Sequence, residues 1–151
     1  GSYCLLMAYS HVGHDCEIGD GVVIVNSTAL SGHVIVEDKA FISGLVGVHQ
    51  FVRIGCYAMV GGMARVNQDI LPFSTVEGNP AKLYSVNAVG LKRANFKPDV
   101  RVAIKKALKF IAQPDLNTNQ ALEKVLAEIE IFDEIQYLVD FIKNSSRGVT
   151  K

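Results

Sequence analysis

The chain contains 151 residues, of which 49% are hydrophobic and 20% are charged, and its 15 basic residues balance its 15 acidic residues. This composition excludes intrinsic disorder, which requires low hydrophobicity and a high net charge. The balanced charge argues against a nucleic-acid-binding protein, because a polyanion is neutralised by a basic excess. No apolar run approaches the roughly 20 residues of a transmembrane helix. We therefore expect a globular protein of one domain or a domain with a small appendage, with no nucleic-acid partner and no transmembrane segment.

The three cysteines, Cys4, Cys16 and Cys56, form no CxxC pair, and their odd number does not suggest a disulfide framework. Such cysteine usage favours a reducing compartment, so we expect a cytoplasmic protein. The chain starts at Gly1 without an initiator methionine or a signal peptide, and it starts inside the repeat described next. We expect it to be the carboxy-terminal portion of a longer protein.

Aliphatic residues recur at every sixth position through the first half of the chain. Eleven consecutive positions follow this spacing: Leu6, Val12, Ile18, Ile24, Leu30, Val36, Ile42, Val48, Ile54, Val60 and Val66. A period of six matches neither a 3.6-residue helix nor a hairpin array, and it is the signature of a hexapeptide parallel β-helix. We predict such a triangular prism over residues 1–71, in a protein that is mainly β with some α.

Each hexad of the prism supplies one strand and one corner, so that three hexads complete a coil and residues 18 apart stack on neighbouring coils. Glycines follow several of the aliphatic positions, at Gly13, Gly19, Gly55 and Gly61, and we expect them to allow positive φ at the corners. Fewer than four coils fit between residues 4 and 71. Because each coil buries its faces only against its neighbours, so short a stack favours oligomerisation.

The period of six stops at Leu71, and the character of the chain then changes twice. Residues 72–97 contain Gly78, Pro80 and Gly90, and we predict an ordered connector loop there. Residues 98–151 show helical periodicity and form the predicted carboxy-terminal helical domain. Its first helix starts at Pro98 and ends before Pro114, and a second is capped by Thr118 or Asn119. Residues 135–142 form a third helix or an extension of the second, which closes near Gly148 as the C′ residue.

Charge is segregated within the carboxy-terminal half, although its sum over the chain is zero. Residues 82–109 hold eight basic residues and one acidic residue, a net charge of +7, and residues 111–142 hold seven acidic residues and one basic residue, a net charge of −6. Two interpretations remain open: helices that attract each other, or a basic surface for an acidic macromolecule or a phosphorylated ligand.

The stacking rule brings titratable residues to one corner of the prism. Residues 13–15 lie over residues 31–33, which lie over residues 49–51, and the polar residues that converge there are His14, Asp15, His33, His49 and Gln50, with His11 at the edge. A histidine next to a carboxylate suits a general base, because its unperturbed pKa is about 6.5 and the carboxylate fixes its tautomer. A corner glycine N–H suits the stabilisation of an oxyanion.

A zinc site is the alternative for these histidines, since three imidazoles and a water form a familiar zinc coordination. Hexapeptide-repeat carbonic anhydrases, however, carry two histidines five residues apart, whereas the separations here are three, 19 and 16 residues. We expect neither a metal nor another cofactor.

Short distinctive segments follow one another from the first coils to the carboxy terminus. They are Ser10-His11-Val12-Gly13-His14-Asp15-Cys16, Leu30-Ser31-Gly32-His33-Val34, Val48-His49-Gln50-Phe51, Met59-Val60-Gly61-Gly62, Gly78-Asn79-Pro80-Ala81, Asn87, Gly90-Leu91-Lys92-Arg93 and Ser146-Arg147-Gly148. In this order they closely resemble the acyl-carrier-protein–UDP-N-acetylglucosamine O-acyltransferases of lipid A biosynthesis. The chain departs from that family at Val89, where a glutamate is frequent, and at Ala94, where a basic residue is usual.

The resemblance implies a homotrimer of left-handed β-helices with active sites between subunits. His14 would take the proton from the sugar 3-hydroxyl as it attacks the thioester of a 3-hydroxyacyl carrier protein, Asp15 would orient His14, and the Gly32 N–H would bind the oxyanion. The other residues that match substrate-binding positions are His11, His33, His49, Gln50, Met59, Gly62, Asn87 and Arg93, with Met59 and Gly62 near the region that measures acyl length.

Two other functions remain open. The related N-acyltransferase of the same pathway also has a hexapeptide prism and a catalytic histidine, although its family lacks the Gly-Leu-Lys-Arg segment after the prism. The chain could also be a noncatalytic trimeric scaffold that binds the carrier protein without turnover.

Overall fold

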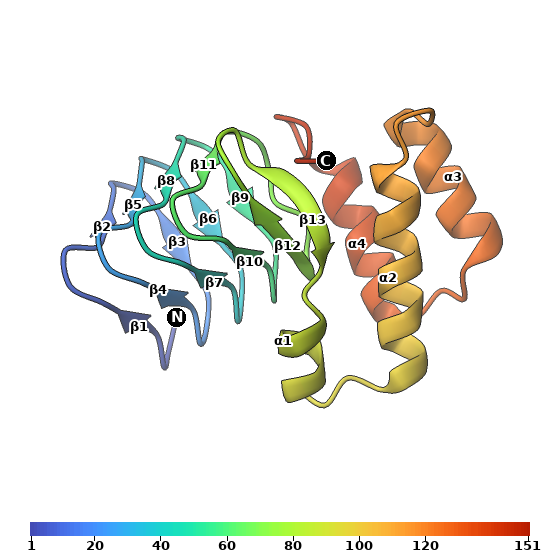
Figure 1. The fold of residues 1–151 in the computed structure, drawn as a ribbon, viewed down its shortest axis with the longest axis horizontal. Coiled ribbons are helices and arrows are strands. Elements are labelled where there is room, and N and C mark those ends of the chain that lie inside the picture. Colours follow the sequence, from blue (N-terminus) through green and yellow to red (C-terminus); the bar gives the residue numbers. More distant parts are fainter.

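The structure is a computed structural model that describes residues 1–151, and it joins a β-helix to a group of helices (Figure 1). Eleven two-residue strands make up the β-helix: β1 (Leu5–Leu6), β2 (His11–Val12), β3 (Glu17–Ile18), β4 (Val23–Ile24), β5 (Ala29–Leu30), β6 (Ile35–Val36), β7 (Phe41–Ile42), β8 (Gly47–Val48), β9 (Arg53–Ile54), β10 (Met59–Val60) and β11 (Arg65–Val66). The predicted fold class, a left-handed parallel β-helix followed by helices, is confirmed.

The strands form three parallel sheets, one for each side of the prism. Face A contains β1, β4, β7 and β10, face B contains β2, β5, β8 and β11, and face C contains β3, β6 and β9. Residues 18 apart are paired, as when Val23 pairs with Phe41 and Phe41 with Met59. The stacking rule used to gather the candidate site residues therefore holds.

The repeated aliphatic side chains point inward and form the core of the prism. From Ile24 to Val66 every one of them is at most 2% exposed. At the amino-terminal end, where no coil lies above, Leu6 is 53% exposed and Val12 is 38% exposed. Burial of these side chains thus depends on a neighbouring coil on each side, as expected for stacked repeats.

Each corner of the prism contains one residue in the left-handed region, and this residue is seldom glycine. The φ angles of Asp15 and His33, for example, are 58° and 59°, and Gly21 is the one glycine in this column of the repeat. Our expectation that the glycines after the aliphatic residues supply positive φ was wrong. Gly13 instead leaves room for the next coil, because a Cβ there would lie 2.8 Å from the carbonyl oxygen of Leu30.

The segment expected as a connector loop, residues 72–97, contains regular structure. Strand β12 (Ser74–Glu77) pairs with β10, strand β13 (Lys82–Val86) turns back antiparallel to β12, and helix α1 (Ala88–Arg93) follows. This hairpin extends face A beyond the last coil. The edge of β10 offers unpaired backbone groups, and their pairing with β12 outweighs the Gly and Pro content that favoured a loop.

Three longer helices complete the chain: α2 (Pro98–Ala112), α3 (Thr118–Glu128) and α4 (Asp133–Lys143). Their apolar faces form a second core, which also includes Leu71 and Phe73. Helix α3 is capped by Asn117, one residue before the positions expected, through a reciprocal bond pair with Gln120. Helix α4 ends at the cap residue Asn144, so Gly148 is not its C′ residue. None of the helices has the length and apolar character that crossing a membrane requires.

Candidate functional site

The polar corner predicted from the sequence is formed as expected, between faces B and C. We call residues 13–15, 31–33 and 49–51 the histidine ridge. Backbone hydrogen bonds hold its coils together, from the His33 N–H to the His14 carbonyl at 2.9 Å and from the Phe51 N–H to the Gly32 carbonyl at 3.2 Å. These bonds between coils fix the backbone position from which each side chain of the ridge projects.

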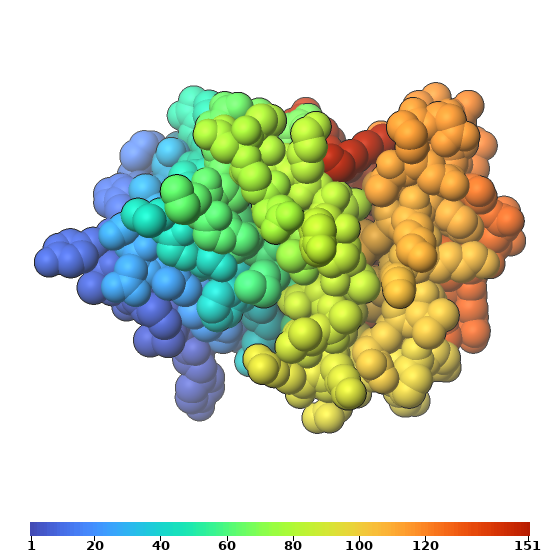
Figure 2. Space-filling model, viewed as in Figure 1, coloured from blue at the N-terminus to red at the C-terminus, as the bar shows by residue number.

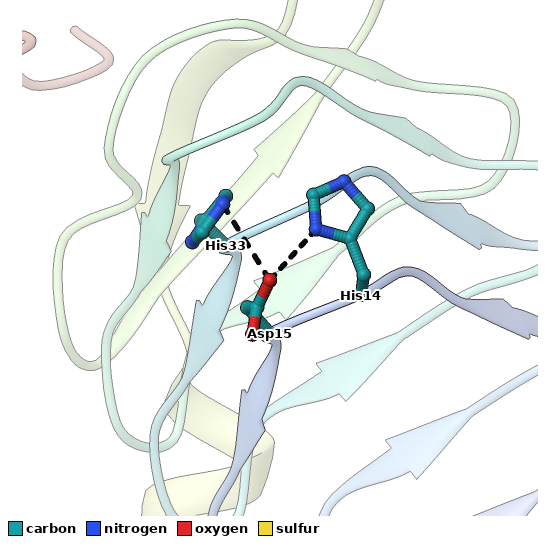
Figure 3. Close-up of side chains that lie close together, drawn as sticks. All are labelled: His14, Asp15 and His33. Carbon is teal, nitrogen blue, oxygen red and sulfur yellow. Dashed lines mark hydrogen bonds and ion pairs between the residues drawn. The ribbon is translucent and has the colours of Figure 1, made fainter.

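The side chains of His14 and His33 both approach the carboxylate of Asp15 (Figure 3). An Asp15 oxygen lies 2.9 Å from Nδ1 of His14 and 3.7 Å from Nε2 of His33. The two imidazole rings meet edge to face, with 5.1 Å between their centroids. All three groups are open to solvent: the side chain of His14 is 75% exposed and that of Asp15 66%.

The hydrogen bond from His14 lowers the pKa of Asp15 below its usual value, and the charge of a protonated His33 adds to the shift. Asp15 is therefore an ionised acceptor at neutral pH. Since it accepts the proton of His14 Nδ1, the assigned tautomer leaves the lone pair of His14 on Nε2. The pair has the arrangement that a general base requires.

Gly32 lies directly against this free nitrogen. A Cβ at Gly32 would lie 2.6 Å from both Cε1 and Nε2 of His14, so any larger residue there would force the ring out of this position. The Gly32 N–H donates no hydrogen bond within the chain. A proton acceptor and an unused backbone donor thus stand side by side, which suits the transfer of an acyl group.

The same cluster also has donor atoms of the kind that metals bind. The ligand atoms of His14, Asp15 and His33 lie within 4.8 Å of one another. The hydrogen bond between His14 and Asp15 already uses two of these atoms, and this bond explains why they lie so close together.

The other predicted residues at this corner, His11, His49 and Gln50, form no hydrogen bond with the side chains of this cluster. His11 lies on β2 and Gln50 is exposed two coils below His14. Two further residues, which were not predicted as functional, contact histidines of the ridge. Phe51 stacks on His33 with 4.7 Å between centroids, and Arg147 contacts Nδ1 of His49 at 3.2 Å. The 18-residue register could have revealed Phe51, whereas Arg147 lies outside the repeat and is included only in the distinctive segment Ser146-Arg147-Gly148, which gives no indication of its contact with His49.

A second candidate region is a cavity of about 570 Å³ between face A, its corner with face C, and α1. We call it the Arg93 pocket. It brings together three of the predicted substrate-binding residues, Met59, Asn87 and Arg93, and its full lining is Gly21, Lys39, Phe41, Tyr57, Met59, Asn87, Val89, Gly90, Arg93 and Ala94. Gly62 lies outside it, at the corner that follows β10, where a Cβ would lie 3.6 Å from the carbonyl oxygen of Gly44, an ordinary van der Waals contact.

Asn87 has a structural part in this pocket. Its side-chain carbonyl accepts the N–H of Gly90 at 3.1 Å and thereby caps α1, and its amide donates to the carbonyl of Tyr57 at 2.8 Å. One amide proton remains for a ligand. Val89 and Ala94, the positions that depart from the family pattern, line the same pocket and make it less charged there.

The two candidate regions lie at different corners of the prism, so a single chain does not bring them into one site. The basic segment, residues 82–109, contributes Asn87 and Arg93 to the Arg93 pocket and extends beyond it. No ion pair joins it to the acidic segment, since the pairs found involve only Asp15 and Glu37 as acids. Of its eight basic residues all but Arg101 are exposed, and the segment, coloured yellow-green to yellow-orange, crosses the face shown in Figure 2.

Two family models match the chain. Residues 69–150 match domain 2 of the UDP-N-acetylglucosamine O-acyltransferases, and residues 1–32 match the bacterial transferase hexapeptide repeats. The acyl-[acyl-carrier-protein]–UDP-N-acetylglucosamine O-acyltransferase of Gloeothece citriformis is 49% identical over 97% of this chain and 52% of its own length. The corresponding enzyme of Anaeromyxobacter sp. strain K is 40% identical over the whole chain and 59% of its own length.

Solved structures agree with these relatives. LpxA of Bacteroides fragilis, a UDP-N-acetylglucosamine acyltransferase, superimposes with a TM-score of 0.96 at 42% identity, over 98% of this chain and 58% of that one. The Arabidopsis UDP-N-acetylglucosamine acyltransferase gives a TM-score of 0.81 at 32% identity, over 94% and 53% of the two chains. The chain spans about half the length of the curated relatives it matches. It belongs to the UDP-N-acetylglucosamine O-acyltransferase family.

Proposed function

We propose that the protein transfers a 3-hydroxyacyl chain from acyl carrier protein to the 3-hydroxyl of UDP-N-acetylglucosamine, the first step of lipid A biosynthesis. The observation that carries this proposal is the hydrogen bond of 2.9 Å between His14 and Asp15, with the unused N–H of Gly32 beside the free nitrogen of His14. The family membership supplies the two substrates, which the relatives' names include.

In this reaction His14 Nε2 takes the proton of the sugar 3-hydroxyl as its oxygen attacks the thioester carbonyl. Asp15 holds the ring and stabilises the imidazolium that forms. The Gly32 N–H donates to the oxyanion of the tetrahedral intermediate. When the intermediate collapses, the C–S bond breaks and His14 returns the proton to the thiolate of the carrier protein. The step requires no metal and no other cofactor.

The nucleotide part of the acceptor occupies the Arg93 pocket. Lys39 and Arg93 supply positive charge for the diphosphate, and Asn87 retains one free amide proton. Met59, within the pocket, and Gly62, at the next corner, belong to the groove that receives the acyl chain. The substrates lie along the histidine ridge, where they contact His11, His33, His49 and Gln50.

A complete site on this proposal requires another copy of the chain. The histidine ridge and the Arg93 pocket lie at different corners, so the ridge of one copy faces the pocket of the next in a homotrimer. The third corner supports association, because three of its exposed side chains are large and apolar: Tyr9 is 90% exposed, Leu45 61% and Met63 73%.

The basic segment, residues 82–109, is the docking surface for the acyl carrier protein. Its lysines are exposed and have no acidic partner within the chain, which leaves them free for an acidic protein. The three cysteines are unpaired, which agrees with a reducing compartment, and we place the protein in the cytoplasm.

The test is an acyl-transfer assay with a 3-hydroxyacyl carrier protein and UDP-N-acetylglucosamine, with the product identified by mass spectrometry. The chain and its His14→Ala variant are compared in the presence of a chelator. We expect an O-acylated sugar nucleotide that depends on His14 and persists with the chelator. A parallel assay offers a UDP-glucosamine derivative with a free 2-amine, and acylation of that amine instead of the 3-hydroxyl would identify the N-acyltransferase. Nucleotide binding without any transfer would identify a scaffold.

A further inference from the structure

The segment after α4 packs back against the last coil of the prism. Asp69, which is 3% exposed, holds it there: its backbone N–H donates to Gly148 at 3.0 Å and its backbone carbonyl accepts from Thr150 at 2.8 Å. One side-chain oxygen of Asp69 accepts from the Ser145 hydroxyl at 2.6 Å, and the other accepts from the Arg53 N–H at 2.8 Å. The terminal segment is therefore anchored on both sides of Arg147.

This anchoring places the half-buried side chain of Arg147 on the histidine ridge. Its Nε and one terminal nitrogen both donate to the carbonyl of Asn67 at 3.3 Å. The same terminal nitrogen lies 3.2 Å from Nδ1 of His49. Arg147 thus bridges the coil that follows the ridge and one of the ridge's own side chains.

The chemistry of the two groups determines the state of His49. A guanidinium has only donors and stays protonated, so the nitrogen that faces it must accept. Nδ1 of His49 therefore carries the lone pair, and the neutral ring carries its proton on Nε2. The carbonyl of Gln50, also 3.2 Å from Nδ1, would favour the opposite tautomer, but that tautomer would set the N–H of the ring against an N–H of Arg147.

We propose that Arg147 is a positioning residue that holds His49 as an Nε2–H donor toward an oxygen of the substrates, either a hydroxyl or a carbonyl. The inference rests on the proposed function for the identity of the substrates, but not for the state of His49. Apart from Gln50, Arg147 is the one residue that contacts a ring nitrogen of His49. The proposal therefore adds the carboxy-terminal segment to the site.

The experiment has one readout that is independent of activity. Nitrogen-15 NMR of the histidine rings, with His49 assigned through a His49→Gln variant, reports which ring nitrogen carries the proton. We expect the Nε2–H tautomer in the unsubstituted chain and a shift toward Nδ1–H in Arg147→Met, where the Gln50 carbonyl is the one remaining partner. Arg147→Lys keeps a donor and should restore the original state at least in part.

Kinetics supply the second readout. Loss of one oriented hydrogen bond to substrate should raise KM about three- to tenfold in Arg147→Met while kcat changes less than twofold. Arg65→Met is the matched control, because Arg65 is an exposed arginine on β11 whose side chain bonds only to Asn79. Chemical denaturation of each variant shows that it is folded.

Two results would overturn the proposal: an Nε2–H tautomer that persists in Arg147→Met, or a changed tautomer with an unchanged KM. If the chain transfers no acyl group at all, the proposed function fails, and the NMR comparison still decides whether Arg147 sets the state of His49.

Discussion

The histidine ridge and the Arg93 pocket are built on the same prism but in different ways. On the ridge, residues 18 apart in the repeat place His14, Asp15 and Gly32 against one another. In the pocket, the repeat supplies one wall, and Asn87 and Arg93 come from the nonrepetitive segment that closes face A. The periodic part of the chain thus fixes the positions of His14, Asp15 and Gly32, whereas Asn87 and Arg93, which we propose to bind the nucleotide, lie in the part that interrupts the period.

The two regions also differ in how their polar groups are used. Nε2 of His14 and the N–H of Gly32 have no partner within the chain, so they are available to a reacting group. The amide of Asn87 already makes two bonds within the chain. Substitutions of His14, Asp15 or Gly32 should therefore change kcat, and substitutions in the pocket should change KM.

The largest effect is expected for His14→Ala. Removal of a positioned general base costs about 10²- to 10⁴-fold in rate, and we expect this loss in kcat with little change in KM for the sugar nucleotide. Steady-state kinetics of acyl transfer measure both constants. An unchanged kcat would remove His14 from the mechanism.

Gly32→Ala should have the next largest effect. The added Cβ would lie 2.6 Å from His14 Nε2 and displace the ring, and a displacement of about 1 Å can cost roughly 10²-fold in rate. Gly47→Ala is the matched control, because nothing lies within 4 Å of a Cβ at Gly47 on β8. Equal kcat values for the two variants would show that the close contact at Gly32 has no role.

Arg93→Ala should act on binding. Loss of one cation from the pocket should raise KM for UDP-N-acetylglucosamine about tenfold, with kcat nearly unchanged. Lys143→Ala removes a charge at the end of α4, outside both the pocket and the basic segment, and serves as the control. A fall in kcat with constant KM in Arg93→Ala would contradict the assignment of the pocket to substrate binding.

The smallest effect concerns stability at a third location, where Glu37 contacts Arg53 at 3.2 Å and Tyr137 of α4. Burial raises the pKa of Glu37 above its ordinary value, although Arg53 opposes the shift. The folded state then binds the proton more tightly than the unfolded state, so the contribution of Glu37 to stability is full at acidic pH and declines as pH rises through the folded pKa.

Urea denaturation of the chain and of Glu37→Gln, at mildly acidic and at neutral pH, measures this difference. Relative to the variant, which has no titrating group there, the unsubstituted chain should lose stability as pH rises. A gain in relative stability over the same range would contradict the assigned direction of the shift.

The ridge could be predicted from the sequence because its geometry is a property of the repeat. Once the period of six is recognised, the positions of Asp15 and His33 follow from a register of 18 residues. The role of the glycines was missed for a local reason: the corner conformation falls two residues after Gly13, on Asp15, and glycine is required where coils approach closely.

Features that depend on distant contacts could not be predicted in this way. The strands β12 and β13 form because β10 presents an open edge, although their segment contains Gly78 and Pro80. Arg147 reaches His49 across 98 residues, through a terminal segment that a buried aspartate holds in place. Neither contact leaves a periodic signal in the sequence.

The most direct test of the shared site is complementation between two inactive forms. His14→Ala lacks the base, and the double variant Asn87→Ala/Arg93→Ala lacks the pocket. If the ridge of one copy serves the pocket of the next, trimers reassembled from an equal mixture regain about a quarter of their sites and the corresponding acyl transfer. A mixture no more active than its separate components would show that the two regions do not meet between copies.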